Sequence, residues 1–164
     1  KSLSVTGSLT SLSLERNKIG PEGAKAIAEM LSANGSLTTL DIRGNSITGN
    51  SATQLSTAVL GNAKIEVFNQ IPIKKMRTDS LTELNLWHKG IGVEGGMVVA
   101  GLLPVMGSLT ECNLRNNKLG VEGWTIIFNA LRDSPSSKIT KWDLTGELLG
   151  PEIHEREVSQ ARRP

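Results

Sequence analysis

Hydrophobic residues recur along the chain in one fixed order: a short alternating stretch, a glycine-containing turn and a stretch with helical spacing. In the first copy, Leu12 and Leu14 alternate with polar residues, which is typical of a strand with one buried face. The turn at 20–23 contains Pro and Glu at positions that favour the start of a helix. Apolar residues then repeat on one helical face, at Ala24, Ile27, Ala28 and Leu31. The pattern therefore predicts a unit of strand, turn, helix and turn.

This unit repeats with a period near 28 residues. Its copies begin at Leu9, Leu37, Leu81, Leu109 and Ile139, and successive starts differ by 28, 44, 28 and 30 residues. The interval of 44 is one period plus 16, so 65–80 is predicted to be a shortened unit. We expect a strand there but no standard helix, because the segment is short and Pro72 opposes one. Neither element can bury its apolar face alone, so the units must stack into a parallel sheet with the helices on its other side.

The repeated pattern LxxLxLxxNxxG resembles that of leucine-rich repeats, and the helix-bearing units resemble the ribonuclease-inhibitor subclass. The resemblance runs from Leu9 to about Ile153. It implies an α/β leucine-rich-repeat solenoid, a curved horseshoe segment with the parallel sheet on its concave face and helices on its convex face. In this interpretation the solenoid covers 1–153, with 1–8 ending a preceding unit of a longer solenoid, and 154–164 form a polar tail or cap.

Several positions depart from the family pattern. Cys112 and Trp142 stand where the family usually has leucine. The family's buried asparagine is present in three units, as Asn17, Asn45 and Asn117. Lys89 and Glu147 replace it in two others. Because this asparagine satisfies strand-edge backbone groups, we expect the asparagine ladder to be interrupted there.

Composition excludes several classes of protein. The 164 residues suit about one domain, and the core must be aliphatic because aromatic residues are 3% and tyrosine is absent. No stretch approaches the roughly 20 apolar residues of a membrane span. One cysteine excludes an internal disulfide framework and, with only two histidines, a zinc site of the CxxC type. The net charge of +2, with only short basic clusters, argues against nucleic-acid binding. We favour an intracellular protein.

Three features that suggest chemistry have simpler explanations in the repeat. The segment 90–95 spells GxGxxG, but the same turn recurs elsewhere without the first glycine, so we expect no nucleotide cofactor. Cys112 takes a buried leucine position and is expected to be inert packing. The sequon at 34–36 matters only in a secreted protein. We therefore expect no catalytic residue, metal site or cofactor, and a protein that is not an enzyme.

The outward positions of the strands form the surface on which we expect a partner to bind. The candidate residues are Arg43, Glu83, Asn85, Trp87, His88, Glu111, Asn113, Arg115 and Asp143. Acidic and basic residues are mixed on this strand face, which suits recognition of another protein's charges better than binding of phosphates.

Two tryptophans are unusual for their positions in the repeat. Trp87 is the only aromatic residue among the outward positions, and its row also contains Arg43 and Arg115. Tryptophan and arginine are enriched at interface hot spots, so Trp87 either anchors a partner or covers the shortened unit beside it. Trp124 replaces a small residue and either fills a gap beside a neighbouring helix or is exposed on the convex face.

The sequence thus predicts a non-enzymatic module that binds a protein partner, of unknown identity, on its concave strand face. One alternative is a structural subunit buried in a large multi-protein assembly. A second is a GTPase-activating regulator of a small GTPase, because relatives with that activity share the repeat subclass. No residue of this chain maps onto that activity by motif. No nucleic acid and no membrane span are expected.

Overall fold

A computed structural model describes residues 9–134 and 137–143. In this part of the chain, six short parallel strands form two sheets of three, in the orders β1-β2-β3 and β4-β5-β6. The strands are β1 (Ser11–Ser13), β2 (Thr39–Asp41), β3 (Val67–Phe68), β4 (Glu83–Asn85), β5 (Glu111–Asn113) and β6 (Lys141–Asp143). Paired residues lie 28 apart, as in Ser11↔Thr39, except between β5 and β6, where they lie 30 apart. The register therefore follows the period of the sequence.

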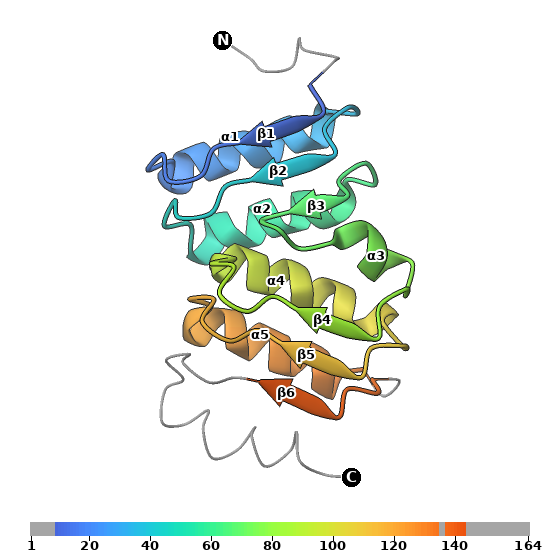
Figure 1. The fold of residues 1–164 in the computed structure, drawn as a ribbon. Helices are drawn as coiled ribbons and strands as arrows, with labels where there is room; N and C mark the ends of the chain where they lie inside the picture. The colour runs from blue at the N-terminus through green and yellow to red at the C-terminus, as the bar shows by residue number, and fades with distance from the viewer. Residues whose placement is uncertain (1–8, 135–136, 144–164) are drawn as a thin grey trace.

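The helices form a second layer behind the strands (Figure 1). They are α1 (Gly20–Ala33), α2 (Gly49–Gly61), α3 (Ile73–Arg77), α4 (Gly92–Leu102), the short 3₁₀ helix η2 (Leu103–Val105) and α5 (Gly120–Arg132). The long helices pack side by side in the order α1, α2, α4 and α5. The observed architecture is thus α/β, with helices and short parallel strands of the leucine-rich-repeat type.

The core lies between the two layers. The central residue of β2, Leu40, is fully buried, and the corresponding Leu84 and Cys112 are 2% exposed. The predicted helical face of α1 is buried from Ala24 to Leu31. Each unit therefore buries one strand residue and one helix face against its neighbours, which is why a single unit cannot be stable alone.

The shortened unit interrupts the sheet. Its strand β3 pairs with β2 but not with β4, contrary to the continuous sheet that the repeat predicted. The chain closes the free edge of β3 itself, because Phe68 and Ile71 exchange backbone hydrogen bonds of 3.2 and 2.7 Å and the Lys74 amide donates to the Glu66 carbonyl. β4 consequently has no access to this edge.

The shortened unit has one short helix in place of a standard one. The five-residue α3 follows Pro72, which occupies its N-cap position rather than preventing the helix. Its last residue, Arg77, donates to the carbonyls of Val59, Leu60 and Asn62 at 3.2, 3.0 and 3.1 Å. A basic side chain thus satisfies carbonyl groups at the C-terminal end of α2.

Because the shortened unit lacks a long helix, α4 packs directly between α2 and α5. Every residue of α4 from Val93 to Ala100 is buried. Small residues make this close packing possible: a Cβ atom added at Gly101 would lie 2.5 Å from Cδ1 of Leu60 in α2, and one added at Gly96 would lie 2.9 Å from Cδ2 of Leu119 at the start of α5. Glu122 of α5 reaches across to accept a hydrogen bond from the Gly49 amide of α2, at 3.2 Å.

The predicted end of a preceding unit at 1–8, Glu147 and the predicted C-terminal tail lie outside the described residues. Within the described part, no helix is long and apolar enough to cross a membrane.

Candidate functional site

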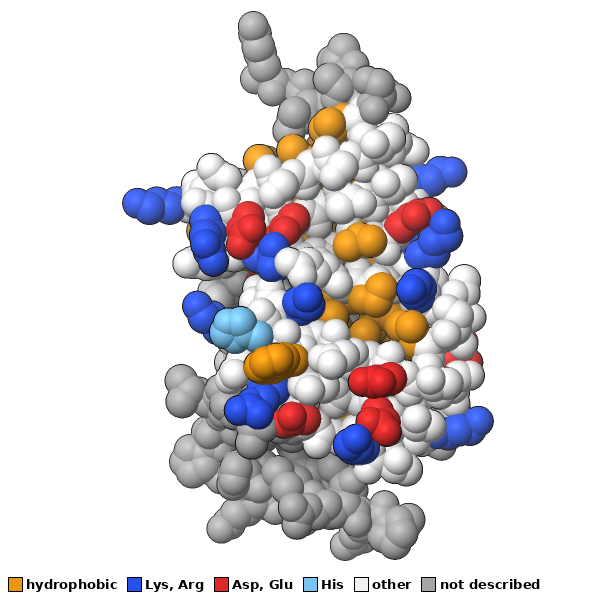
Figure 2. Space-filling model, in the orientation of Figure 1, with side chains coloured by type: hydrophobic (Ala, Val, Ile, Leu, Met, Phe, Trp, Pro, Cys, Tyr) orange, Lys and Arg blue, Asp and Glu red, His pale blue; other side chains and the backbone are white. Residues whose placement is uncertain are grey.

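The strands present the predicted partner-binding residues on one face of the molecule. In β4, Leu84 is buried whereas Glu83 and Asn85 on either side are exposed, as expected for alternation along a strand. Trp87, His88 and Arg115 are also exposed, and the other candidate residues are partly buried: Arg43, Glu111, Asn113 and Asp143. Figure 2 shows acidic and basic side chains interspersed over this strand face.

Trp87 is the most exposed large hydrophobic side chain of the described residues, with 55% of its surface accessible. Its ring lies beside the imidazole of His88, with 6.4 Å between the ring centroids. Its backbone amide donates to Oδ1 of Asn85 at 3.1 Å, and the Arg115 amide donates in the same way to Asn113. The two asparagines therefore support the chain where β4 and β5 end.

The row of Arg43, Trp87 and Arg115 is not continuous. The shortened unit places Ile71, which is fully buried, at the position between Arg43 and Trp87. Arg43 nevertheless crosses the interruption: its Nη1 donates to the Lys89 carbonyl at 2.9 Å. The two sheets are thus connected on this face by a side chain rather than by strand pairing.

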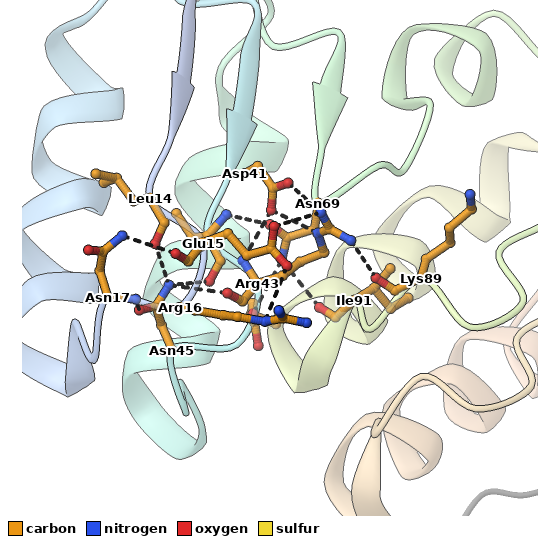
Figure 3. A network of polar contacts seen from close by, with 12 residues as sticks. Leu14, Glu15, Arg16, Asn17, Asp41, Arg43, Asn45, Asn69, Lys89 and Ile91 are labelled. Carbon is orange, nitrogen blue, oxygen red and sulfur yellow. Dashed lines mark hydrogen bonds and ion pairs between the residues drawn. The ribbon is translucent and has the colours of Figure 1, made fainter.

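Arg43 is the centre of a charged network (Figure 3). Its guanidinium donates to both carboxylate oxygens of Asp41, at 2.8 and 2.7 Å, and to Glu15 at 3.3 Å. Partial burial raises the pKa of Asp41, but the hydrogen bonds and charge of Arg43 outweigh this effect, so the pKa lies below its ordinary value. With only 16% of its side chain exposed, Arg43 serves mainly to organise this junction.

At the opposite end of β4 and β5 the face is more acidic. Glu83 is exposed, and Glu111 forms an ion pair with Lys141, with Nζ 2.7 Å from Oε2. An ion pair this exposed contributes little to stability. Of the predicted site residues at this end, Glu111 is engaged in an ion pair and Glu83 is the carboxylate that a partner can reach.

Buried asparagines hold the turns that follow the strands. Oδ1 of Asn45 accepts hydrogen bonds from the amides of Asn17 and Ile19, and Oδ1 of Asn117 accepts the equivalent bonds from Lys89 and Ile91. Each side chain also donates to carbonyls of its own unit and the preceding one. These bonds satisfy backbone groups that the turns leave unpaired.

A further buried asparagine, Asn69 of the shortened unit, bonds a different set of backbone groups from the ladder asparagines, and the sequence analysis did not single it out. Asn69 is fully buried; its Oδ1 accepts from the Ile42 amide at 2.9 Å. Its Nδ2 donates to the Ile91 carbonyl and to Oε1 of Glu94, both at 3.2 Å. Asn69 therefore joins the end of β2 to the start of α4. The only signal in the sequence was an asparagine in the shortened unit, at a repeat position other than that of Asn17, Asn45 and Asn117.

Glu94 is the second residue that sequence reasoning missed. It occupies the same repeat position as Glu22 and Glu122, which are exposed, yet Glu94 is only 3% exposed. Burial raises the pKa of Glu94 to about 7, and the hydrogen bond from Asn69 offsets this only in part. Its position in the repeat indicated an exposed acid at a helix start, and only the packing of the shortened unit buries it.

A cavity of about 520 Å³ is lined by residues of the units on both sides of the shortened unit and by none of 65–80. Two loops face it, 44–48 after β2 and 88–93 after β4. Its acidic and basic lining residues are Glu15, Arg16, Arg43, Lys89, Glu94 and Lys118, and His88 also lines it. A larger cavity of about 680 Å³ lies between α1 and α2, away from the strand face, with Lys25 and Glu29 as its charged residues.

The GxGxxG segment has the conformation of the repeat turn. Gly90 has a φ of +64°, and Lys18, Ser46 and Lys118 at the same repeat position also have positive φ values, from +54° to +60°. The first glycine is therefore explained by the turn itself. Among the described residues, no group of three His, Cys, Asp or Glu side chains is placed to hold a metal ion.

Cys112 and Trp124 are both core residues. Cys112 is buried, and burial raises the pKa of its thiol, which favours the unreactive protonated form. Trp124 is fully buried, with its ring centroid 5.7 Å from that of Phe128. The interpretation of Trp124 as a space-filling residue is confirmed, and it is not available as an exposed contact.

Comparisons with known proteins agree with the repeat. Residues 8–28 and 33–56 match the family model described as Leucine Rich repeat. No curated protein sequence matches the chain. A solved structure that resembles it is the tropomodulin C-terminal domain of Caenorhabditis elegans, with 15% sequence identity, coverage of 96% of this chain and 84% of that chain, and a TM-score of 0.44. A likeness at that level supports no conclusion about function. The family-model matches at 8–28 and 33–56 and the repeated units of parallel strand, turn and helix in the described residues together support leucine-rich repeats in this chain.

Proposed function

We propose that this protein is a non-enzymatic interaction module of the ribonuclease-inhibitor-like subclass, which binds a protein partner on a concave strand face. Leucine-rich-repeat domains generally mediate protein–protein interaction, through the extended surfaces that stacked repeats create. In this proposal the two layers form a segment of a curved horseshoe, with the helices on the convex side.

The observation that carries the proposal is the exposed Trp87 among mixed charges. A half-exposed tryptophan beside His88, with Arg115 exposed on the next unit, is the composition typical of an interface anchor. Exposed Glu83 at the other end of β4 adds a charge of opposite sign, so the face can select a partner by its charge pattern.

The test begins with cross-linking mass spectrometry on the native source, which identifies the partner and the contacting face. We expect the double substitution Trp87→Ala, Arg115→Ala to weaken the complex by over about 2 kcal/mol, or about 30-fold in Kd. The matched control, Val121→Ala with Lys25→Ala, removes an exposed apolar residue and a cation from the helix layer and should leave Kd within about twofold. Unchanged affinity in the first variant, or an equal loss in the control, would place the partner elsewhere.

A further inference from the structure

The interruption of the sheet leaves β4 with an open edge. Among the described strands β4 pairs only with β5. The Thr82 carbonyl and the Leu86 amide of this segment bond to the β5 chain. Because alternate residues of a strand direct their backbone groups to opposite sides, the amide and carbonyl groups of Glu83 and Asn85 point away from β5.

Hydrophobic side chains are exposed next to this edge. Figure 2 shows a group of them over α3 and the stretch between β3 and β4, where Pro72 and Leu81 are partly exposed. An extended segment placed beside β4 would therefore find backbone groups to pair with and an apolar surface for alternate side chains, as in the addition of a peptide strand to a sheet edge.

The cavity at the C-terminal end of β4 is predominantly basic. Four arginine and lysine residues line it together with His88, against the carboxylates of Glu15 and Glu94. Arg43 is occupied by Asp41 and Glu15. The ammonium group of Lys89 makes no ion pair or hydrogen bond with the described residues. The side chain of Arg16 is 83% exposed, and its Nε lies 3.6 Å from Oε1 of Glu15. The side chains of Lys89 and Arg16 can thus bind carboxylate groups of a partner.

We infer that the shortened unit creates a docking site for an extended acidic segment of the protein partner. The backbone of the segment pairs with the open edge of β4, its apolar side chains cover the patch near α3, and its carboxylates contact Arg16 and Lys89 in the cavity. This inference rests on the proposed function and specifies the chemistry of the partner. A nucleic acid fits less well, since Asp41, Glu15 and Glu83 would repel a continuous phosphate chain.

The probe is a capped synthetic peptide of alternating Thr and Val residues that ends in three Glu residues, with a control peptide that ends in three Gln. Binding is followed by amide chemical shifts and hydrogen exchange. We expect the acidic peptide to bind about tenfold more tightly than the Gln peptide and to protect the Glu83 and Asn85 amides from exchange. Equal binding of both peptides, no binding of either, or comparable binding of a thymidine decamer overturns the acidic-segment assignment. Binding without protection of these amides overturns the pairing with β4.

Variants separate this inference from the proposed function. Arg16→Ala with Lys89→Ala should weaken the acidic peptide about tenfold, whereas Lys25→Ala with Lys64→Ala, which changes the net charge equally, should have less than about a twofold effect. With the natural partner, a loss for Trp87→Ala, Arg115→Ala but none for Arg16→Ala, Lys89→Ala refutes the docking site and keeps the proposed function. The opposite result keeps the docking site and refutes the role of Trp87.

Discussion

Protonation of the buried Glu94 should make the stability of the fold depend on pH near neutrality. Glu94 is 3% exposed, and the pKa of its carboxyl group rises from an ordinary value of 4.5 to about 7 because burial disfavours the charged form. In the unfolded chain the group loses its proton near pH 4.5. Between pH 4.5 and about 7 the folded state therefore binds more protons than the unfolded state. The contribution of Glu94 to the free energy of unfolding is therefore fully present below about pH 4.5 and is lost as the pH rises through about 7.

The size of the effect follows from the two pKa values. At about 1.4 kcal/mol for each tenfold change in proton affinity, the rise from 4.5 to about 7 corresponds to about 3 kcal/mol in total. Most of this should be lost between about pH 5 and about pH 8. Such a loss is a large fraction of the roughly 5–15 kcal/mol that stabilises an ordinary domain.

The measurement is urea unfolding of the wild type and of Glu94→Gln across this pH range, followed by tryptophan fluorescence and circular dichroism. Glutamine keeps an oxygen that can accept the bond from Asn69 but does not ionise, so the variant should lack this loss of stability. The control Glu22→Gln changes an exposed acid at the same repeat position and should retain the wild-type dependence. Parallel pH profiles for wild type and Glu94→Gln would show that the buried carboxyl group does not titrate as argued.

Two further substitutions test the packing around the shortened unit. Asn69→Ala leaves the buried amide of Ile42 without its acceptor and should lower the free energy of unfolding by about 2–4 kcal/mol in urea titrations; a change below about 0.5 kcal/mol would mean that the junction of β2 and α4 does not depend on Asn69. Gly95→Ala places a Cβ 2.6 Å from the Cβ of Ile91 and should cost about 1–3 kcal/mol, measured as a lower Tm, whereas Gly61→Ala in open space should have little effect. Equal Tm values for the two glycine variants would contradict the close packing at the start of α4.

Much of the fold can be predicted from the periodicity because each regular unit buries the same face of its strand and of its helix against its neighbours. Leu40 and Leu84 are buried at equivalent strand positions, and the strand pairs have the 28-residue register of the sequence. The exposure of Trp87 on the strand face also follows from alternation along the chain. These features depend on local pattern and nearest-neighbour stacking, which repeat from unit to unit.

The sequence by itself determined the regular units, their register and the side chains that face outward, because period and alternation specify which face of each element is buried. The tertiary structure alone decided what happens at the irregular unit. There the chain folds back to close β3, Asn69 joins the end of β2 to the start of α4, and Glu94 becomes buried although its repeat equivalents are exposed. These outcomes depend on how α2, α4 and the two sheets pack together when a long helix is absent. The local pattern of hydrophobic and polar residues does not specify this packing. The same absence leaves β4 open beside a basic cavity, so the departure from the repeat provides the docking site that we propose.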